Sequence, residues 1–159
     1  MLYIIAARFI SGPFTKFDFD TGMETNSETD WDIGFRSTDI IVNGGSSMGT
    51  TDEPTRNGDG GAYIAMGTMA DVTEVDVSLF TQDSENGYAI MSGSGNGWYT
   101  YTGPPTFLVT PTAGRILVFK TADGKFAKVE ILSYYQGAPD SPDAFTDQSR
   151  YYTFNYVYQ

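Results

Sequence analysis

The side chains that could do chemistry in this sequence are mainly carboxylates. There are twenty Asp and Glu residues, but no His and no Cys. These absences exclude a Ser-His-Asp triad, a cysteine nucleophile, disulfides, thiolate metal sites and ligation of a metal by imidazole. We therefore expect a binding protein rather than an enzyme, unless the carboxylates themselves form a site.

Acid–base hydrolysis of glycosides requires two carboxylates that face each other across a cleft. No pattern in this sequence indicates a pair of carboxylates with that role. Asp18 and Asp20 share the outer face of a predicted strand, and Asp30 and Asp32 flank Trp31 in the same way. All four are expected to be solvated, which disfavours a glycosidase.

Calcium is the second option for the carboxylates, because it prefers hard oxygen ligands. Two acidic groups lie on loops rich in Gly and Pro: Asp52, Glu53 and Asp59, and Asp140, Asp143 and Asp147. Neither group has the spacing of an EF-hand loop or of the glycine-rich nonapeptide repeat. A structural calcium ion therefore stays an open alternative.

The overall charge limits the partners. The formal net charge is −11 and the isoelectric point is near 4.1, whereas nucleic acids and anionic membranes select clustered Lys and Arg. We therefore expect no nucleic-acid partner. The apolar stretch 2–7 is too short to span a membrane and has no basic residues before it, so it predicts a first strand, or the start of a chain whose leader has been removed.

Many turn residues and short apolar runs predict an all-β protein. Eighteen Gly and seven Pro are spread along 159 residues, and apolar residues nowhere recur at helical spacing over three turns. The length suits one domain, residues 1–159, made of two packed antiparallel sheets.

The C-terminal third carries the strongest strand signals. Residues 116–121 and 126–135 flank Asp123-Gly124, which predicts a tight hairpin turn. After a polar loop at 136–148, residues 151–158 place the rings of Tyr152, Phe154, Tyr156 and Tyr158 on one face. This last strand is expected to pair with the hairpin and close the core, so that its removal unfolds the protein.

The rest of the chain predicts shorter strands. They cover residues 2–8, 14–20 with Phe17 and Phe19 inward, 30–35 with Trp31, Ile33 and Phe35 inward, and 38–42. The glycine-rich segment 44–61 predicts a functional or disordered loop. Between residues 62 and 107 the pattern is weaker and fits either short strands or extended loops, at 63–66, 75–80, 88–91 and 98–101.

Three blocks of sequence resemble the HmuY haemophore family and occur in the family's order. They are Trp31-Asp32-Ile33-Gly34-Phe35 followed by Asn43-Gly44-Gly45, then residues 120–128 (KTADGKFAK), then residues 151–156 (YYTFNY). The resemblance implies an all-β, hand-like HmuY-like fold with extended, finger-like loops that hold haem at one end. It also implies iron acquisition by a secreted or cell-surface lipoprotein that delivers haem to a TonB-dependent outer-membrane receptor.

The resemblance also directs attention to methionine. The best-known members ligate haem iron through two His residues, which this sequence lacks, and some relatives are thought to use Met, whose thioether is a suitable soft ligand. The family carries its ligands between the first and second blocks, where this sequence has Met48, Met66, Met69 and Met91. The alternative for each is that it fills an irregular part of the core.

The same region holds aromatic candidates for the walls of a porphyrin pocket: Tyr63, Tyr88, Trp98, Tyr99 and Tyr101. The alternative is that about half of them face the core, since Trp98 and Tyr99 must point to opposite faces if they lie on a strand. Arg36 and Arg56 are the nearest cations for haem propionates, but solvated surface arginines are the preferred interpretation.

The resulting hypothesis is non-enzymatic haem binding by the loops of the middle third. Met69 and Met91 are the first choice of axial ligands and Met66 the next, with Tyr63, Trp98 and Tyr99 as pocket walls. The competing hypothesis is a surface-binding or adhesion module of the same fold, which recognises a glycan or a protein through exposed aromatic residues and binds no haem.

Overall fold

The computed structural model describes residues 1–6 and 12–159 of the chain. Within them, the regular structure is β-strand apart from one 3-10 helix, η1 (Val77–Leu79). The predicted all-β class is confirmed. Of the predicted first strand, β1 covers Leu2–Ala6, and residues 7 and 8 lie outside the described residues.

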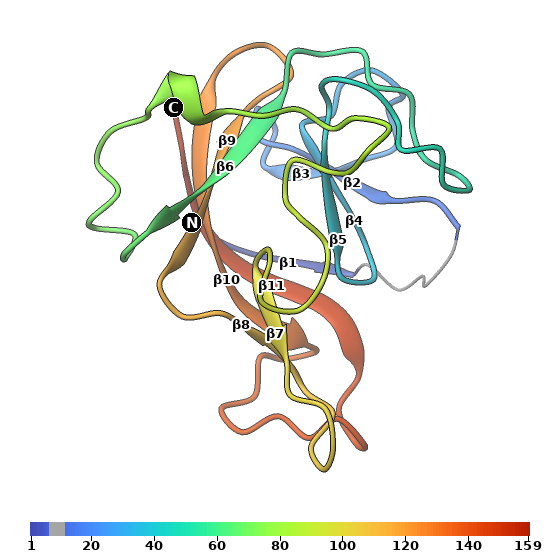
Figure 1. Cartoon of the computed structure of the whole chain (residues 1–159), viewed down its shortest axis with the longest axis vertical. Coiled ribbons are helices and arrows are strands. Elements are labelled where there is room, and N and C mark those ends of the chain that lie inside the picture. The colour runs from blue at the N-terminus through green and yellow to red at the C-terminus, as the bar shows by residue number, and fades with distance from the viewer. Residues whose placement is uncertain (7–11) are drawn as a thin grey trace.

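The larger sheet has five antiparallel strands in the order β1-β11-β10-β9-β6 (Figure 1). Besides β1, its strands are β11 (Ser149–Tyr158), β10 (Phe126–Tyr135), β9 (Arg115–Lys120) and β6 (Gly61–Met66). The predicted hairpin joins β9 to β10, with Gly124 at φ +88° in the turn. The predicted C-terminal strand is β11, and it lies between β10 and β1.

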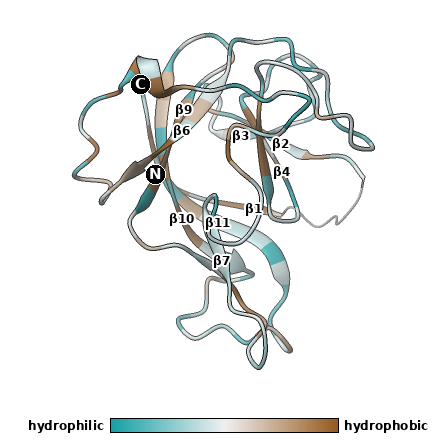
Figure 2. Cartoon of the chain, in the orientation of Figure 1, coloured by the Kyte–Doolittle hydropathy of each residue, from teal (hydrophilic) through white to brown (hydrophobic). Residues whose placement is uncertain are grey.

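The smaller sheet packs against the larger one and completes the core. It contains four strands in the order β3 (Met23–Thr25), β2 (Thr15–Asp18), β4 (Ile33–Arg36) and β5 (Asp39–Val42). Phe17 of β2 lies 5.6 Å from the ring of Phe154, and Phe35 of β4 lies 4.7 Å from that of Tyr152. The predicted packing of two antiparallel sheets is thereby confirmed, and Figure 2 shows hydrophobic colour concentrated on strands and hydrophilic colour on many loops.

A two-stranded ribbon extends from the lower end of the molecule in Figure 1. It consists of β7 (Tyr99–Tyr101) and β8 (Val109–Pro111). The loop at its tip and the polar loop 136–148 lie side by side there, because the rings of Phe107 and Phe145 are 5.8 Å apart. Phe145 is 74% exposed. These two loops form the finger-like end of the protein.

The region of weak sequence signal folds partly as strand. Segments 63–66 and 99–101 lie in β6 and β7, whereas 75–80 contains η1 and 88–91 is irregular. Of the four segments for which the sequence left strand and loop open, two thus contain a strand and two do not. Regular pairing stops where backbone groups bond to side chains instead, as where Ala89 N donates to Asp83 Oδ1 at 2.8 Å.

Two expectations of solvated charge were wrong. Asp32 was expected on an outer face but is only 4% exposed, because β4 lies between β2 and β5 with both faces covered. Because both faces of β4 are covered, Trp31 does not pack in the main core that holds Ile33 and Phe35. It packs in a separate cluster with Phe14, Ile41 and Tyr88.

The second correction concerns the arginines near segment 44–61. Arg36 and Arg56 are buried rather than solvated. Arg36 donates to the carbonyls of Gly12 and Thr51, at 2.9 and 2.5 Å. Arg56 is ion-paired with Glu53 and Asp83, so neither guanidinium is available to an external ligand.

Candidate functional site

Met66 and Met91 present their thioethers at the surface. Met66 ends β6 and is 72% exposed, and Met91 follows the buried Ile90 and is 60% exposed. Exposure of this degree shows that neither side chain fills the core. Their sulfur atoms are therefore free to act as soft metal ligands.

The register of β6 and β9 fixes the direction of Met66. Met66 is paired with Arg115, just as Ile64 is paired with Leu117 further into the sheet. Because side chains alternate along a strand, Met66 and Arg115 project on the face that carries Ile64 and Leu117 into the core. They lie beyond the edge of that core, where Met66 becomes exposed.

Arg115 connects this strand end to the segment that carries Met91. Its Nη1 donates to the carbonyl oxygen of Gly97 at 2.5 Å. Gly97 in turn lies against the backbone of Met91, so closely that a Cβ at position 97 would collide with the Met91 carbonyl oxygen. A single guanidinium therefore links the two segments that bear exposed thioethers.

The loop 92–97 is held by side-chain hydrogen bonds. Ser92 Oγ donates to Asp39 Oδ1 at 2.8 Å, Ser94 Oγ accepts from Tyr101 N at 2.8 Å, and Asn96 Nδ2 donates to the carbonyl of Ser92 at 3.1 Å. These contacts attach the loop to β5 and β7. Met91 consequently occupies a defined position at the start of an ordered loop.

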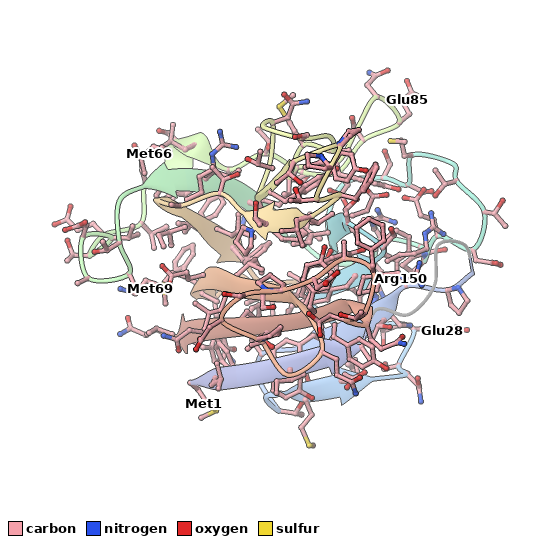
Figure 3. All side chains as sticks on the ribbon, turned by 90° about the horizontal axis from the view of Figure 1, so that it is seen from below. Met1, Glu28, Met66, Met69, Glu85 and Arg150 are labelled. Carbon is pink, nitrogen blue, oxygen red and sulfur yellow. The ribbon has the colours of Figure 1, made fainter. Side chains whose placement is uncertain are left out.

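Met69 lies on the other side of the large sheet. Lys128 projects from the outer face of β10, because its neighbours Ala127 and Val129 are in the core, and its Nζ donates to the carbonyls of Met69 and Val72. Segment 67–76 thus crosses the outer face, where it borders a groove of about 250 Å³ whose walls include Val72, Val75, Val118 and Val157. Figure 3 shows Met66 and Met69 at the same end of the molecule but well separated.

The aromatic candidates occupy three different environments. Trp98 and Tyr99 are both buried in the main core, with the indole Nε1 donating to the carbonyl of Thr38 at 2.8 Å. They are adjacent and yet both buried, because Trp98 precedes β7 and strand alternation does not apply to it. Tyr63 lies on the outer face, with its ring 5.0 Å from Phe80, and Tyr101 is 46% exposed.

Sequence reasoning missed Arg115 as part of this site. Nothing in the spacing of the sequence sets it apart, since it precedes the predicted hairpin as an ordinary flanking charge. Only the pairing of β6 with β9 brings it next to Met66. The exposed ring pair of Phe107 and Phe145 was missed for the same reason, because it joins two loops that are distant in sequence.

The buried carboxylates have shifted pKa values. Burial raises the pKa of Asp32 to about 6, although its oxygens accept hydrogen bonds from Ala122 N and Phe19 N at 2.9 and 2.8 Å. Burial would also raise the pKa of Glu53, but hydrogen bonds from Thr50, Met48 N and Arg56 outweigh it and lower that pKa to about 2.

The carboxylates do not gather into a metal site. Over residues 1–6 and 12–159, no group of three or more Asp or Glu side chains is arranged to hold a metal ion. Asp59 is ion-paired with Lys120, and Asp143 and Asp147 accept hydrogen bonds from backbone amides of their own loop.

The described part of the chain also has no helix long and apolar enough to cross a membrane.

The fold is a pair of packed antiparallel sheets with finger-like loops at one end. The sequence matches the HmuY protein family over residues 13–156, and the chain therefore belongs to the HmuY family. No curated protein matches the sequence.

Solved structures share the fold. An apo HmuY analogue from Tannerella forsythia has a TM-score of 0.66 at 13% identity, covering 100% of this chain and 95% of its own. A candidate lipoprotein from Bacteroides fragilis has a TM-score of 0.60 at 15% identity, covering 98% and 89%. A candidate HmuY-like haem-binding protein from Bacteroides vulgatus has a TM-score of 0.59 at 14% identity, covering 98% and 90%.

Proposed function

We propose that this protein binds haem or a related tetrapyrrole without transforming it, and that the thioethers of Met66 and Met91 ligate the iron. The observation that carries the proposal is the contact of Arg115 with Gly97, which joins two segments with exposed thioethers in a chain that has no His and no Cys. Membership of the HmuY family supports it, since one structural relative is named for haem binding.

The residues present suit the group. Thioether sulfur is an established axial ligand of haem iron and raises its reduction potential, which is the chemistry that the bound group would supply. Met66 offers such a sulfur on the core-facing side of the large sheet, and Met91 offers one next to the buried Ile90. Ile64, which is partly buried, lies on the same face as Met66, so the residue next to Met66 on this face is apolar.

The pairing of Met69 with Met91, preferred from the sequence, stays a prediction. The strand register favours Met66, because Met69 belongs to the segment that covers the outer face of the sheet. Trp98 and Tyr99 support the site from within the core rather than lining an open wall. Tyr63 would contact a ligand only on the outer face.

The biological part of the proposal is haem delivery at the cell surface. Family membership and the likeness to a candidate lipoprotein support a location outside the cell or on the outer membrane. Transfer to a TonB-dependent receptor would serve iron acquisition. The acidic surface, with a net charge of −11, suits a partner whose contact surface is basic.

A titration with haemin in oxidised and reduced form tests the proposal. The wild type should give a saturable, red-shifted Soret band. Met66→Ala and Met91→Ala should each weaken binding or change the band, whereas Met23→Ala should not, because Met23 is similarly exposed at 58% but lies on β3 of the other sheet. Absence of a saturable band in either redox state would reject haem binding.

The finger-like end supports a second candidate function. Phe145 is 74% exposed and Phe107 is 41% exposed, and their rings meet edge to face. Asp143 and Asp147 accept hydrogen bonds that shape the turn around Phe145. Such a preformed aromatic tip suits recognition of a glycan or a protein without haem. Binding lost in Phe145→Ala but retained in Met66→Ala and Met91→Ala would support this alternative.

A further inference from the structure

A strongly acidic protein needs an uncommitted cation to hold a ligand that carries carboxylates. The net charge of −11 repels anions at long range, so recognition depends on local contacts. The availability of each Lys and Arg therefore decides where such a ligand can bind.

Most of the Lys and Arg side chains that the structure describes are buried or already form ion pairs or hydrogen bonds within the protein. Arg36 and Arg56 are buried. Lys120 and Lys125 form ion pairs with aspartates at the surface. The remaining lysines donate to backbone carbonyls: Lys16 to Ser27, and Lys128 to Met69 and Val72.

Arg115 differs from these in position. Like Lys16 and Lys128, it donates to a backbone carbonyl, that of Gly97, and it forms no ion pair with any residue that the structure describes. Arg150 also forms no ion pair among the described residues, but it lies at the opposite end of the molecule. Arg115 is only partly buried, it pairs with Met66 across β6 and β9, and it reaches the loop that begins at Met91. A guanidinium with no ion pair among the described residues thus adjoins the strand end that bears Met66 and contacts the loop that follows Met91.

We propose that Arg115 recognises the carboxylates of the ligand, so that the site selects tetrapyrroles with free carboxylate side chains over neutral ones. This inference rests on the proposed tetrapyrrole site. A guanidinium binds a carboxylate through two parallel charge-assisted hydrogen bonds, each about twice as strong as a neutral one. Only Nη1 is bonded to Gly97, and a guanidinium has five N–H donors, so donors remain for a carboxylate while the contact with Gly97 is kept.

The test compares haemin with its dimethyl ester, in which both carboxylates are neutral. Dissociation constants for both are measured with the wild type, Arg115→Gln, Arg115→Lys and Arg150→Gln. Arg115→Gln removes the charge and is too short to keep the contact with Gly97, whereas Arg115→Lys keeps a charge. Arg150 is the matched control, because its Nε has no partner and Figure 3 places it at the end of the molecule opposite Met66 and Met69.

The wild type should bind haemin at least about tenfold more tightly than the ester, as expected for a charge-assisted contact. Arg115→Gln should abolish that ratio, Arg115→Lys should keep part of it, and Arg150→Gln should leave it unchanged.

Other outcomes would overturn the inference. Equal affinity of the wild type for haemin and ester would reject carboxylate recognition while leaving the proposed function in place. An equal loss of affinity for both ligands in Arg115→Gln would show that Arg115 only holds the loop. If the wild type bound neither compound, the proposed function would fail and this inference with it.

Discussion

The guanidinium of Arg56 and the carboxylate of Asp83 form an ion pair that solvent does not reach. Nη2 lies 2.8 Å from Oδ2, and neither side chain has exposed surface. Arg56 Nε also donates to the carbonyl of Val42, and Asp83 accepts hydrogen bonds from Val42 N and Ala89 N. The pair therefore attaches two irregular segments of the chain to the edge of β5.

We expect Arg56→Met to lower the free energy of unfolding by about 3–5 kcal/mol, because it leaves Asp83 buried without its counter-charge. Urea unfolding at pH 7 measures this. Lys125→Met is the control, since its ion pairs with Asp20 and Asp123 are exposed and should contribute little. A loss in Arg56→Met no larger than in the control would contradict the assigned role.

The two faces of β11 should differ sharply in their contribution to stability. Phe154 has no exposed surface and contacts Phe17 and Phe35 of the other sheet. We expect Phe154→Ala to cost about 3–5 kcal/mol of unfolding free energy. Val157→Ala on the opposite face, where the side chain is 44% exposed, should cost far less. Similar losses in the two variants would argue against a core between the sheets.

Asp32 should make stability depend on pH. Burial raises its pKa from 3.8 to about 6, so the folded state binds the proton more tightly than the unfolded chain does. The folded state therefore gains stability as pH falls from 6 to 4, by at most about 3 kcal/mol, and bears the cost of the ionised form above pH 6.

Two measurements check this prediction. An NMR titration of the Asp32 carboxyl carbon should give a midpoint near 6. The stability of the wild type relative to Asp32→Asn, which stays neutral, should rise between pH 7 and pH 4. A midpoint at or below 3.8 would show that the hydrogen bonds from Phe19 and Ala122 outweigh burial.

Local patterns sufficed to predict the C-terminal third of the fold. The Asp123-Gly124 turn and the alternation of Tyr152, Phe154 and Tyr156 depend only on neighbouring residues, and both recur in the structure. Burial of Asp32 and Arg56 could not be predicted in this way. It depends on the distant segments that cover β4 and β5, and the residues next to Asp32 and Arg56 in the sequence do not indicate these contacts.

The candidate site was predictable by residue type but not by arrangement. The absence of His and Cys already directed attention to methionine. The choice among Met66, Met69 and Met91 depends on which face of the large sheet each one occupies, and this follows from the pairing of β6 with β9. Arg115 enters the site through the same long-range pairing.

The most direct test of the central claim is NMR of protein labelled with ¹³C at its methionine methyl groups, in complex with reduced haem. Six methyl signals are expected from the six methionines, and Met66→Ala and Met91→Ala assign two of them. Thioether ligation by this pair predicts that these two signals shift far upfield, because the ring current of the porphyrin acts on methyl groups directly above and below it. If the Met66 and Met91 signals stay in place while others shift, or if all six stay unchanged, the account is contradicted.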